Sequence, residues 1–192
     1  LGYSDTLPIT IDELIIFGRA VAGAAKRALV IVDMPFGSYE TGVDDALRNA
    51  IRIMKETGAD GVKLEGGVRS AEQIAAIVQA GIPVMGHVGF TPQSVHALGG
   101  FKVQGRGENA DYLLAEATAV EAAGAFAVVI EMTPTEIAGK VTDSLKIPTI
   151  GIGAGPQTDG QILVWTDFAG LNGKKVPRFV KIFANLREDL TK

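Results

Sequence analysis

Short runs of consecutive apolar residues recur along the chain, and each is followed by a longer stretch in which apolar residues repeat every three or four positions. Uninterrupted apolar runs are typical of parallel strands buried on both faces, whereas the longer spacing is typical of amphipathic helices. Six strands are predicted, over Leu29–Asp33, Gly61–Glu65, Ile82–His87, Phe126–Glu131, Ile147–Ile152 and Gln161–Trp165. Their alternation with helices indicates an α/β fold built on a parallel sheet.

The predicted helices carry recognisable signals at their ends. Thr10 and Glu13 form a capping box at the start of a helix over Ile11–Lys26, and Gly58 is a left-handed cap for a second helix that contains Val43. Four further helices are predicted: after Ser70 and before Gly81, from Ala110 to Ala123, from Thr133-Pro134-Thr135-Glu136 onward with Pro at the first helical position, and over Phe179–Leu186.

Such a pattern leaves two architectures open, an open doubly wound sheet and a closed barrel. A complete (β/α)8 barrel takes about 250 residues, so a chain of 192 residues accommodates about three quarters of one. Only about nine residues separate the fifth and sixth predicted strands, which is too few for a crossover helix, so a turn at Thr158–Gly160 is expected there. No linker or internal repeat is apparent, and residues 1–192 are therefore interpreted as one domain.

Composition narrows the class of protein. The chain is 47% hydrophobic and 21% charged, its mean hydropathy is +0.24, and 18 basic against 22 acidic side chains leave a net charge of -4. These values predict a folded globular chain and, without a basic run, no nucleic-acid partner. The absence of Cys excludes a disulfide scaffold and a thiolate nucleophile and fits a reducing compartment. No apolar stretch approaches the roughly 18 residues that span a bilayer, so no membrane partner is expected.

Four of the predicted strands end in an ionisable side chain: Asp33, Glu65, His87 and Glu131. The carboxyl ends of the strands of a parallel barrel lie on one face, where barrel enzymes keep their active sites. Lys63 lies two residues before Glu65 and therefore points to the same side of its strand. A charge inside an apolar strand is costly unless it is paired. The sequence therefore predicts one polar site that gathers these five side chains.

Each of these residues also has a simpler interpretation. A carboxylate at a strand end often caps a helix or turn, and Asp33 precedes Met34-Pro35-Phe36, where it would cap a turn. A single imidazole such as His87 is often only a hydrogen-bonded core residue, and His96 is interpreted as structural. The functional interpretation rests on the five residues taken together.

Carboxylates without Cys and with few His favour a hard, oxygen-binding cation such as Mg²⁺ over zinc. A metal beside Lys63 would suit a 2-oxo acid, whose carboxylate and keto oxygen chelate Mg²⁺, and Glu131 would then be free to act as the base. Carboxylates alone do not dictate this assignment.

Two glycine-rich stretches complete the candidate chemistry. The stretch Gly151–Gly155 departs from the dinucleotide-binding pattern because Pro156 follows it, and it either holds a phosphate or marks close packing of backbone. The stretch Gly99–Gly107 is long and basic, and it is either a lid over an acidic site or a solvated loop.

Segments around these residues resemble the ketopantoate hydroxymethyltransferase family. The matching segments are Thr6-Leu7-Pro8-Ile9-Thr10, Asp33-Met34-Pro35-Phe36, Val62–Gly67, Gly86–Ser94, Lys102–Arg106 and Gly151–Gly155 through Asp159-Gly160-Gln161, and they follow the family's order over nearly the whole chain. The resemblance implies a (β/α)8 TIM barrel of the phosphoenolpyruvate/pyruvate type. It also implies transfer of a hydroxymethyl group from 5,10-methylenetetrahydrofolate to 3-methyl-2-oxobutanoate, which gives 2-dehydropantoate for pantothenate and coenzyme A biosynthesis.

The resemblance also assigns roles to the site residues. Asp33 would bind Mg²⁺ and the oxo acid, Lys63 the oxo acid and Glu65 the metal, while Glu131 would accept the proton. His87 falls in the substrate-binding neighbourhood. Family members are cytoplasmic in bacteria and form homo-oligomers, commonly decamers.

The amino terminus departs from the family pattern, which places an Asp-Ser pair at the end of the second strand as metal ligand and substrate contact. This chain starts at Leu1, just after that point. We therefore expect the first two strands and the pair to be absent from it and the barrel domain to be incomplete. Two other functions stay open: another metal-dependent 2-oxo acid lyase of the same barrel superfamily, or a catalytically silent ligand-binding scaffold.

Overall fold

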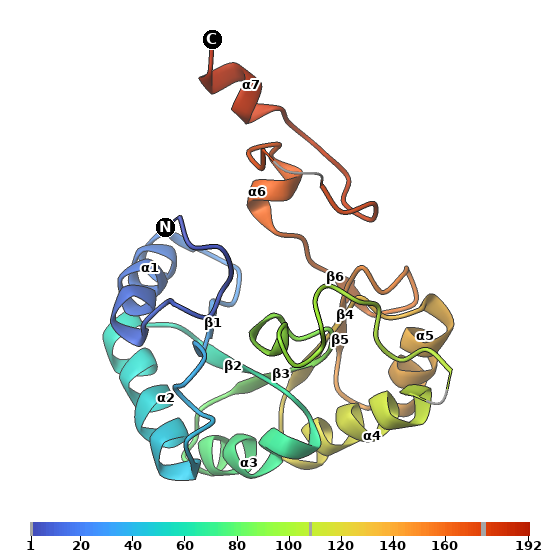
Figure 1. The fold of residues 1–192 in the computed structure, drawn as a ribbon. Helices are drawn as coiled ribbons and strands as arrows, with labels where there is room; N and C mark the ends of the chain where they lie inside the picture. Colours follow the sequence, from blue (N-terminus) through green and yellow to red (C-terminus); the bar gives the residue numbers. More distant parts are fainter. Residues whose placement is uncertain (1, 108, 174–175) are drawn as a thin grey trace.

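The structure is a computed structural model that describes residues 2–107, 109–173 and 176–192 (Figure 1). One sheet contains six parallel strands in the order of the chain, β1-β2-β3-β4-β5-β6. The strands are β1 (Ile31–Asp33), β2 (Gly61–Glu65), β3 (Val84–Gly89), β4 (Ala127–Glu131), β5 (Thr149–Ile152) and β6 (Gly160–Gln161). An unbroken sequential order is that of a barrel wall, because a doubly wound sheet reverses its strand order.

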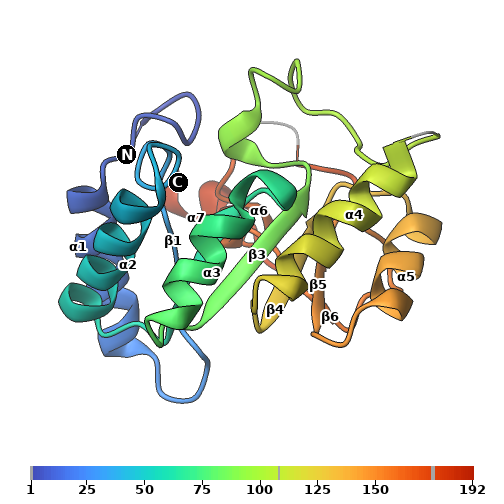
Figure 2. The ribbon, with the colours of Figure 1, turned by 90° about the horizontal axis from the view of Figure 1, so that it is seen from below.

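Five longer helices lie in an arc around the outside of this sheet, as Figures 1 and 2 show. They are α1 (Ile11–Ala24), α2 (Val43–Thr57), α3 (Ala71–Gln79), α4 (Asn109–Ala122) and α5 (Thr135–Ser144), and shorter turns form η1 (Val68–Ser70), η2 (Pro92–Ser94), α6 (Trp165–Phe168) and α7 (Leu186–Leu190). The predicted capping box of Thr10 and Glu13 is present, and Gly58 ends α2 at φ 75°. Pro134 is the N-cap of α5 and not its first helical residue, so this helix begins at Thr135, one residue later than predicted.

The two faces of the sheet differ in character because alternate residues of a strand point to opposite sides. One face packs against the helices, and its buried side chains include Val62, Leu64, Val84, Val88, Val128 and Ile130. Gly86 belongs to this face, where a Cβ would lie 2.3 Å from Cγ1 of Val120 on α4. The intervening residues, which include Lys63 and Glu65, therefore project from the concave face.

The carboxy-terminal part of the chain differs from the sequence prediction. The amphipathic helix predicted over Phe179–Leu186 is wrong, because residues 176–185 form no regular helix and α7 begins only at Leu186. Phe179, Ile182 and Phe183 remain 41%, 49% and 66% exposed. A short helix is stabilised mainly by burying its apolar face. In the described part of this segment most of that face stays exposed, although Phe183 contacts Phe168 edge to face at a ring separation of 6.2 Å.

The end of the sheet also needs a correction. The last strand stops at Gln161, and Trp165, predicted as the end of that strand, instead begins α6. β5 and β6 are joined without a helix, as the short spacing predicted. The parallel α/β sheet is therefore confirmed, whereas the closed eight-stranded barrel stays a prediction. Within the described residues, no helix has the length and apolar character to cross a bilayer.

Candidate active site

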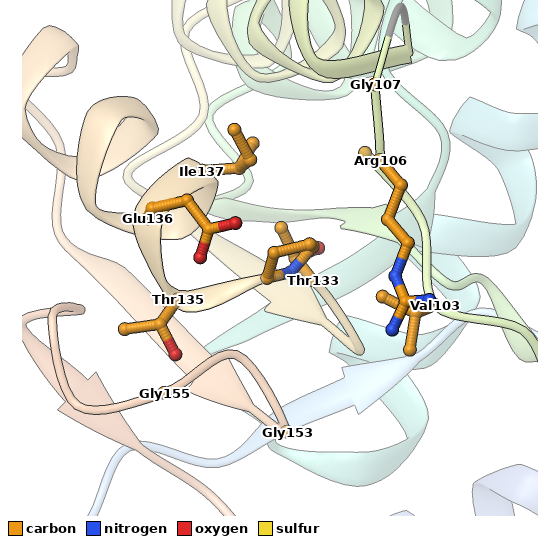
Figure 3. A pocket seen from close by; sticks show the side chains of 11 residues that line it. Val103, Arg106, Gly107, Thr133, Thr135, Glu136, Ile137, Gly153 and Gly155 are labelled. Atoms are coloured by element: carbon orange, nitrogen blue, oxygen red, sulfur yellow. The ribbon is translucent and has the colours of Figure 1, made fainter.

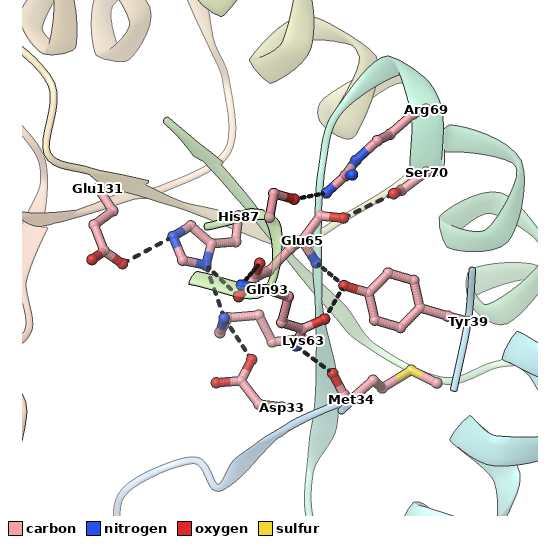
Figure 4. A network of polar contacts seen from close by, with 11 residues as sticks. Asp33, Met34, Tyr39, Lys63, Glu65, Arg69, Ser70, His87, Gln93 and Glu131 are labelled. Atoms are coloured by element: carbon pink, nitrogen blue, oxygen red, sulfur yellow. Dashed lines mark hydrogen bonds and ion pairs between the residues drawn. The ribbon is translucent and has the colours of Figure 1, made fainter. Parts of the chain in front are cut away.

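Strand register brings the five predicted polar residues to the carboxyl ends of four adjacent strands. Asp33 pairs with Lys63 between β1 and β2, and Glu65 pairs with His87 between β2 and β3. Glu131 is the last residue of β4. The structure thus places all five side chains together on the concave face, as Figure 4 shows.

A continuous line of polar contacts crosses this cluster. Lys63 Nζ lies 2.5 Å from Asp33 Oδ1 and 3.0 Å from His87 Nδ1. On the other side of the imidazole, Nε2 lies 3.2 Å from Glu131 Oε2, although the contact is not aligned as a hydrogen bond. Among the residues that the structure describes, Nε2 has no hydrogen-bond partner. Glu65 Oε1 is 3.9 Å from His87 Nδ1. Asp33 therefore pairs with the lysine inside the strand, whose charge needed a partner.

The imidazole at the centre of the line is neutral. Its complete burial, together with the Lys63 ammonium, lowers the pKa of His87 well below its ordinary value. An ammonium group only donates hydrogen bonds, so Nδ1 of His87 accepts and the ring proton lies on Nε2, which faces Glu131. The sequence left open a core role for this residue, but both of its nitrogens lie against other members of the cluster.

Two carboxyl groups of the cluster have pKa values close to neutrality. Burial raises the pKa of Glu65 to about 7, and it raises the pKa of Glu131 to about 7 as well. The positive charge of Lys63 opposes both increases. Asp33, in contrast, has a side chain that is 54% exposed. The site therefore holds one solvent-facing carboxylate, Asp33, and two carboxyl groups that are able to exchange protons near pH 7, the buried Glu65 and the partly buried Glu131.

The carboxylates of Asp33 and Glu65 fit a hard cation. Within residues 2–107, 109–173 and 176–192, no group of three or more His, Cys, Asp or Glu side chains is arranged to hold a metal by itself. Mg²⁺ is commonly held by one or two protein carboxylates, with ligand and water oxygens completing the octahedron. An oxygen-only pair of carboxylates beside a lysine suits that mode together with an anionic ligand.

Sequence reasoning missed two residues that support Glu65. Tyr39 Oη donates to Gln93 Oε1 at 2.6 Å, and the backbone N–H of Gln93 donates to Glu65 Oε2 at 2.9 Å. Gln93 lies in the segment Gly86–Ser94 that carried the family resemblance, but nothing in its spacing indicated this contact.

A cavity of about 490 Å³ adjoins the end of β4 (Figure 3). Both glycine-rich stretches contribute to its lining, through Arg106 and its neighbours and through Gly153 and Gly155. The first turn of α5 also contributes, and its N-cap residue makes no side-chain capping bond. Thr133 links the cavity to the cluster, because its hydroxyl donates to the Glu131 carbonyl at 3.2 Å. The phosphate-binding and lid roles of these stretches stay predictions.

Comparison with known proteins identifies closely similar sequences. A family described as ketopantoate hydroxymethyltransferase matches residues 1–192. A protein from Leifsonia xyli named 3-methyl-2-oxobutanoate hydroxymethyltransferase is 65% identical over 191 residues, which cover 100% of this chain and 69% of the relative. A protein of the same name from Corynebacterium efficiens is 62% identical, and the match covers 99% of this chain and 71% of that protein. A protein of the same name from Mycobacterium ulcerans is 60% identical, and the match covers 98% of this chain and 64% of that protein.

Solved structures of distant sequence share the fold. A putative phosphonomutase from Burkholderia cenocepacia superimposes with a TM-score of 0.60 at 18% identity, over 80% of this chain and 70% of that one. A phosphonopyruvate hydrolase, crystallised as a complex with oxalate and Mg²⁺, superimposes with a TM-score of 0.55 at 19% identity, over 79% of this chain and 55% of that one. At these identities the likeness concerns the fold alone.

Proposed function

Because the chain belongs to the ketopantoate hydroxymethyltransferase family, we propose that it transfers a hydroxymethyl group from 5,10-methylenetetrahydrofolate to 3-methyl-2-oxobutanoate. The product would be 2-dehydropantoate, on the route to pantothenate and coenzyme A. The observation that carries this proposal is the line of contacts from Asp33 through Lys63 and His87 to Glu131. Its first end carries the proposed cation ligand Asp33, and its other end carries the proposed base Glu131.

The first end of the line is where we place the oxo acid. The Lys63 ammonium is available to the carboxylate of the acid, and its contact with Asp33 fixes its position. Asp33 and Glu65 are the residues that would hold Mg²⁺. When bound, the metal would supply positive charge to the keto oxygen as negative charge develops there. The structurally similar phosphonopyruvate hydrolase was crystallised with oxalate, a small chelating acid, together with Mg²⁺.

At the other end, Glu131 is the proposed base. A carboxyl group with a pKa near 7 is well matched to removing a proton at neutral pH. Glu131 takes the proton from C3 of the oxo acid, and the electron pair of that C–H bond forms the new bond to the folate-borne carbon. The two C–N bonds of that carbon break, and one water molecule supplies the hydroxyl group of the product. Tetrahydrofolate leaves with the proton of that water and the proton from C3 on its two nitrogens. The Nε2–H of His87 lies 3.2 Å from Glu131 Oε2 without hydrogen-bond alignment, and we propose that it aligns with the carboxylate and orients it when the oxo acid binds. His87 is therefore a positioning residue for the base.

We place the folate donor in the cavity beside β4. The donor is an anion, and the cavity offers the Arg106 guanidinium together with the amino-terminal turn of α5, where the Glu136 carboxylate also lines the wall. Its volume of about 490 Å³ is within the usual range for small-molecule sites. This position leaves the one-carbon unit next to the strand end that carries Glu131.

Family resemblance further leads us to propose a cytoplasmic homo-oligomer, with a decamer as the expected form. Phe179, Ile182, Phe183 and Leu190 are exposed in the carboxy-terminal segment. Apolar side chains gathered in one exposed segment favour burial against another subunit.

The test is exchange of the C3 proton of 3-methyl-2-oxobutanoate in D₂O, followed by proton NMR with Mg²⁺ and without the folate donor. Glu131→Gln keeps the shape of the side chain and removes the base, so exchange is expected to fall by about 10²–10⁴-fold. Binding of the oxo acid, measured by calorimetry, is expected to change little. Glu72→Gln, an exposed position on α3, is the control.

Persistent exchange in Glu131→Gln would refute the assignment of the base. Metal-dependent binding of the oxo acid without exchange or turnover in the native protein would instead favour a silent scaffold. Turnover of another oxo acid in preference to this one would favour a lyase of the same superfamily.

A further inference from the structure

Tyr39 and Gln93 connect the end of β1 with the end of β2. The side-chain amide of Gln93 donates from Nε2 to the carbonyl of Met34 at 2.8 Å, and its backbone N–H donates to Glu65 Oε2 at 2.9 Å. Met34 directly follows Asp33. One residue therefore holds both the backbone beside one carboxylate and the other carboxylate itself, as Figure 4 shows.

The direction of each hydrogen bond in this arrangement is determined by chemistry. The backbone N–H of Glu65 only donates, so the Tyr39 hydroxyl accepts from it at 3.3 Å and uses its own proton toward Gln93 Oε1 at 2.6 Å. The carbonyl of Met34 only accepts, so the amide nitrogen of Gln93 must face it. The amide therefore has one allowed orientation, and the bonds form a closed ring that returns to Glu65.

Burial makes this ring rigid. Tyr39 is 1% exposed, and its hydroxyl proton is directed at Gln93 Oε1. A buried hydroxyl that loses its partner is costly, which favours one arrangement over alternatives. Ser70 adds a further constraint, because its hydroxyl donates to the carbonyl of Glu65 at 2.8 Å.

We propose that Tyr39 and Gln93 act as a brace that fixes the separation of the Asp33 and Glu65 carboxylates and so pre-organises the cation site. The inference rests on the proposed function, because it concerns the residues that would hold the metal. The hydrogen bonds of the ring join Tyr39 and Gln93 to each other and to the β1 and β2 ends, and none of them reaches the proposed base. They are therefore positioning residues for the cation.

The strength of the expected effect follows from the demands of the ion. Mg²⁺ and ions of similar size require nearly ideal octahedral geometry with short bonds, so a small displacement of one carboxylate weakens binding. Changes in the residues that orient metal ligands typically lower metal affinity by about 10–100-fold. Loss of the brace should therefore appear first in cation affinity, before any loss of fold.

The experiment measures Mn²⁺ binding to the full-length protein by the EPR signal of the free ion. Gln93→Met removes the amide but keeps the backbone N–H that holds Glu65, and Tyr39→Phe removes only the hydroxyl. Each variant is expected to bind Mn²⁺ about 10–100-fold more weakly. The double variant is expected to bind Mn²⁺ only slightly more weakly than the single variant with the lower affinity, because both changes open the same ring of hydrogen bonds.

Thr142→Val is the matched control, since it removes a hydrogen bond to Thr149 at 2.9 Å, away from the cluster. It is expected to lower the melting temperature without changing Mn²⁺ affinity. Melting curves without metal verify that each variant folds. If Gln93→Met does not fold, Tyr39→Phe decides the matter, because it keeps the aromatic side chain in place and removes only the hydroxyl.

The two levels of the proposal fail differently. Wild-type affinity for Mn²⁺ in both folded brace variants would overturn the brace and leave the proposed function standing. Absence of Mn²⁺ binding in the native protein would overturn the metal site of the proposed function, and with it the brace.

Discussion

The raised pKa of Glu131 gives the proposed reaction a characteristic dependence on pH. Burial raises that pKa to about 7, although the positive charge of Lys63 lowers it and so cancels part of the increase. A general base works only when it is deprotonated. At saturating oxo acid and Mg²⁺, the rate of C3 proton exchange should therefore rise with pH through neutrality and become constant at higher pH.

The size of the change follows from the pKa. A group with a pKa of about 7 is about 9% deprotonated at pH 6 and about 91% deprotonated at pH 8, so the exchange rate should differ about tenfold between them. A carboxyl group with the ordinary pKa of 4.5 would be almost fully ionised at both pH values, and the rate would change by only roughly 3%. These outcomes are easily distinguished.

The assay is proton NMR of the C3 signal in D₂O at a series of pH values. Glu65 also has a pKa raised to about 7, and saturation with Mg²⁺ separates its contribution, because a metal-bound carboxylate stays ionised. Glu131→Gln serves as the control and should lose the pH-dependent limb. A constant exchange rate between pH 6 and pH 8 in the native protein would refute the reasoning.

Two further outcomes are expected from single substitutions. Arg106→Gln should raise KM for 5,10-methylenetetrahydrofolate about tenfold, because it removes one charge-assisted contact. The rate of C3 exchange without the donor should be unchanged. If that exchange rate fell as much as the donor's KM rose, Arg106 would instead lie at the oxo acid. Gly86→Ala should lower the free energy of unfolding in urea by about 1–3 kcal/mol, because its Cβ would meet Val120 at 2.3 Å. Adding Val120→Ala should recover part of that loss, and a native-like midpoint for Gly86→Ala alone would show that the packing is described wrongly.

The strands and the polar cluster were predictable because both leave local marks in the sequence. Strands buried on both faces need consecutive apolar residues, so the charge of Lys63 within such a run indicated a partner. The partner proved to be Asp33, at the end of the neighbouring strand. Register in a parallel sheet then brings the remaining strand ends together without further information.

The brace was not predictable in the same way. Tyr39 and Gln93 are 54 residues apart and carry no charge, and each lies outside any periodic pattern. Their contact depends on how two loops fold over the ends of β1 and β2. The Phe179–Leu186 segment shows the reverse case, in which a pattern is present but the predicted structure is not. Apolar residues at helical spacing do not reveal whether another part of the protein packs against them, and here they stay exposed.

The most direct test of the proposed site is a crystal structure of the full-length protein with Mg²⁺ and 3-methyl-2-oxobutanoate. We expect carboxylate oxygens of Asp33 and Glu65 at about 2.1 Å from the ion, and the Glu131 carboxylate within about 3.5 Å of C3 of the acid. An ion held by other residues, or a carboxylate of Glu131 turned away from C3, would contradict the account.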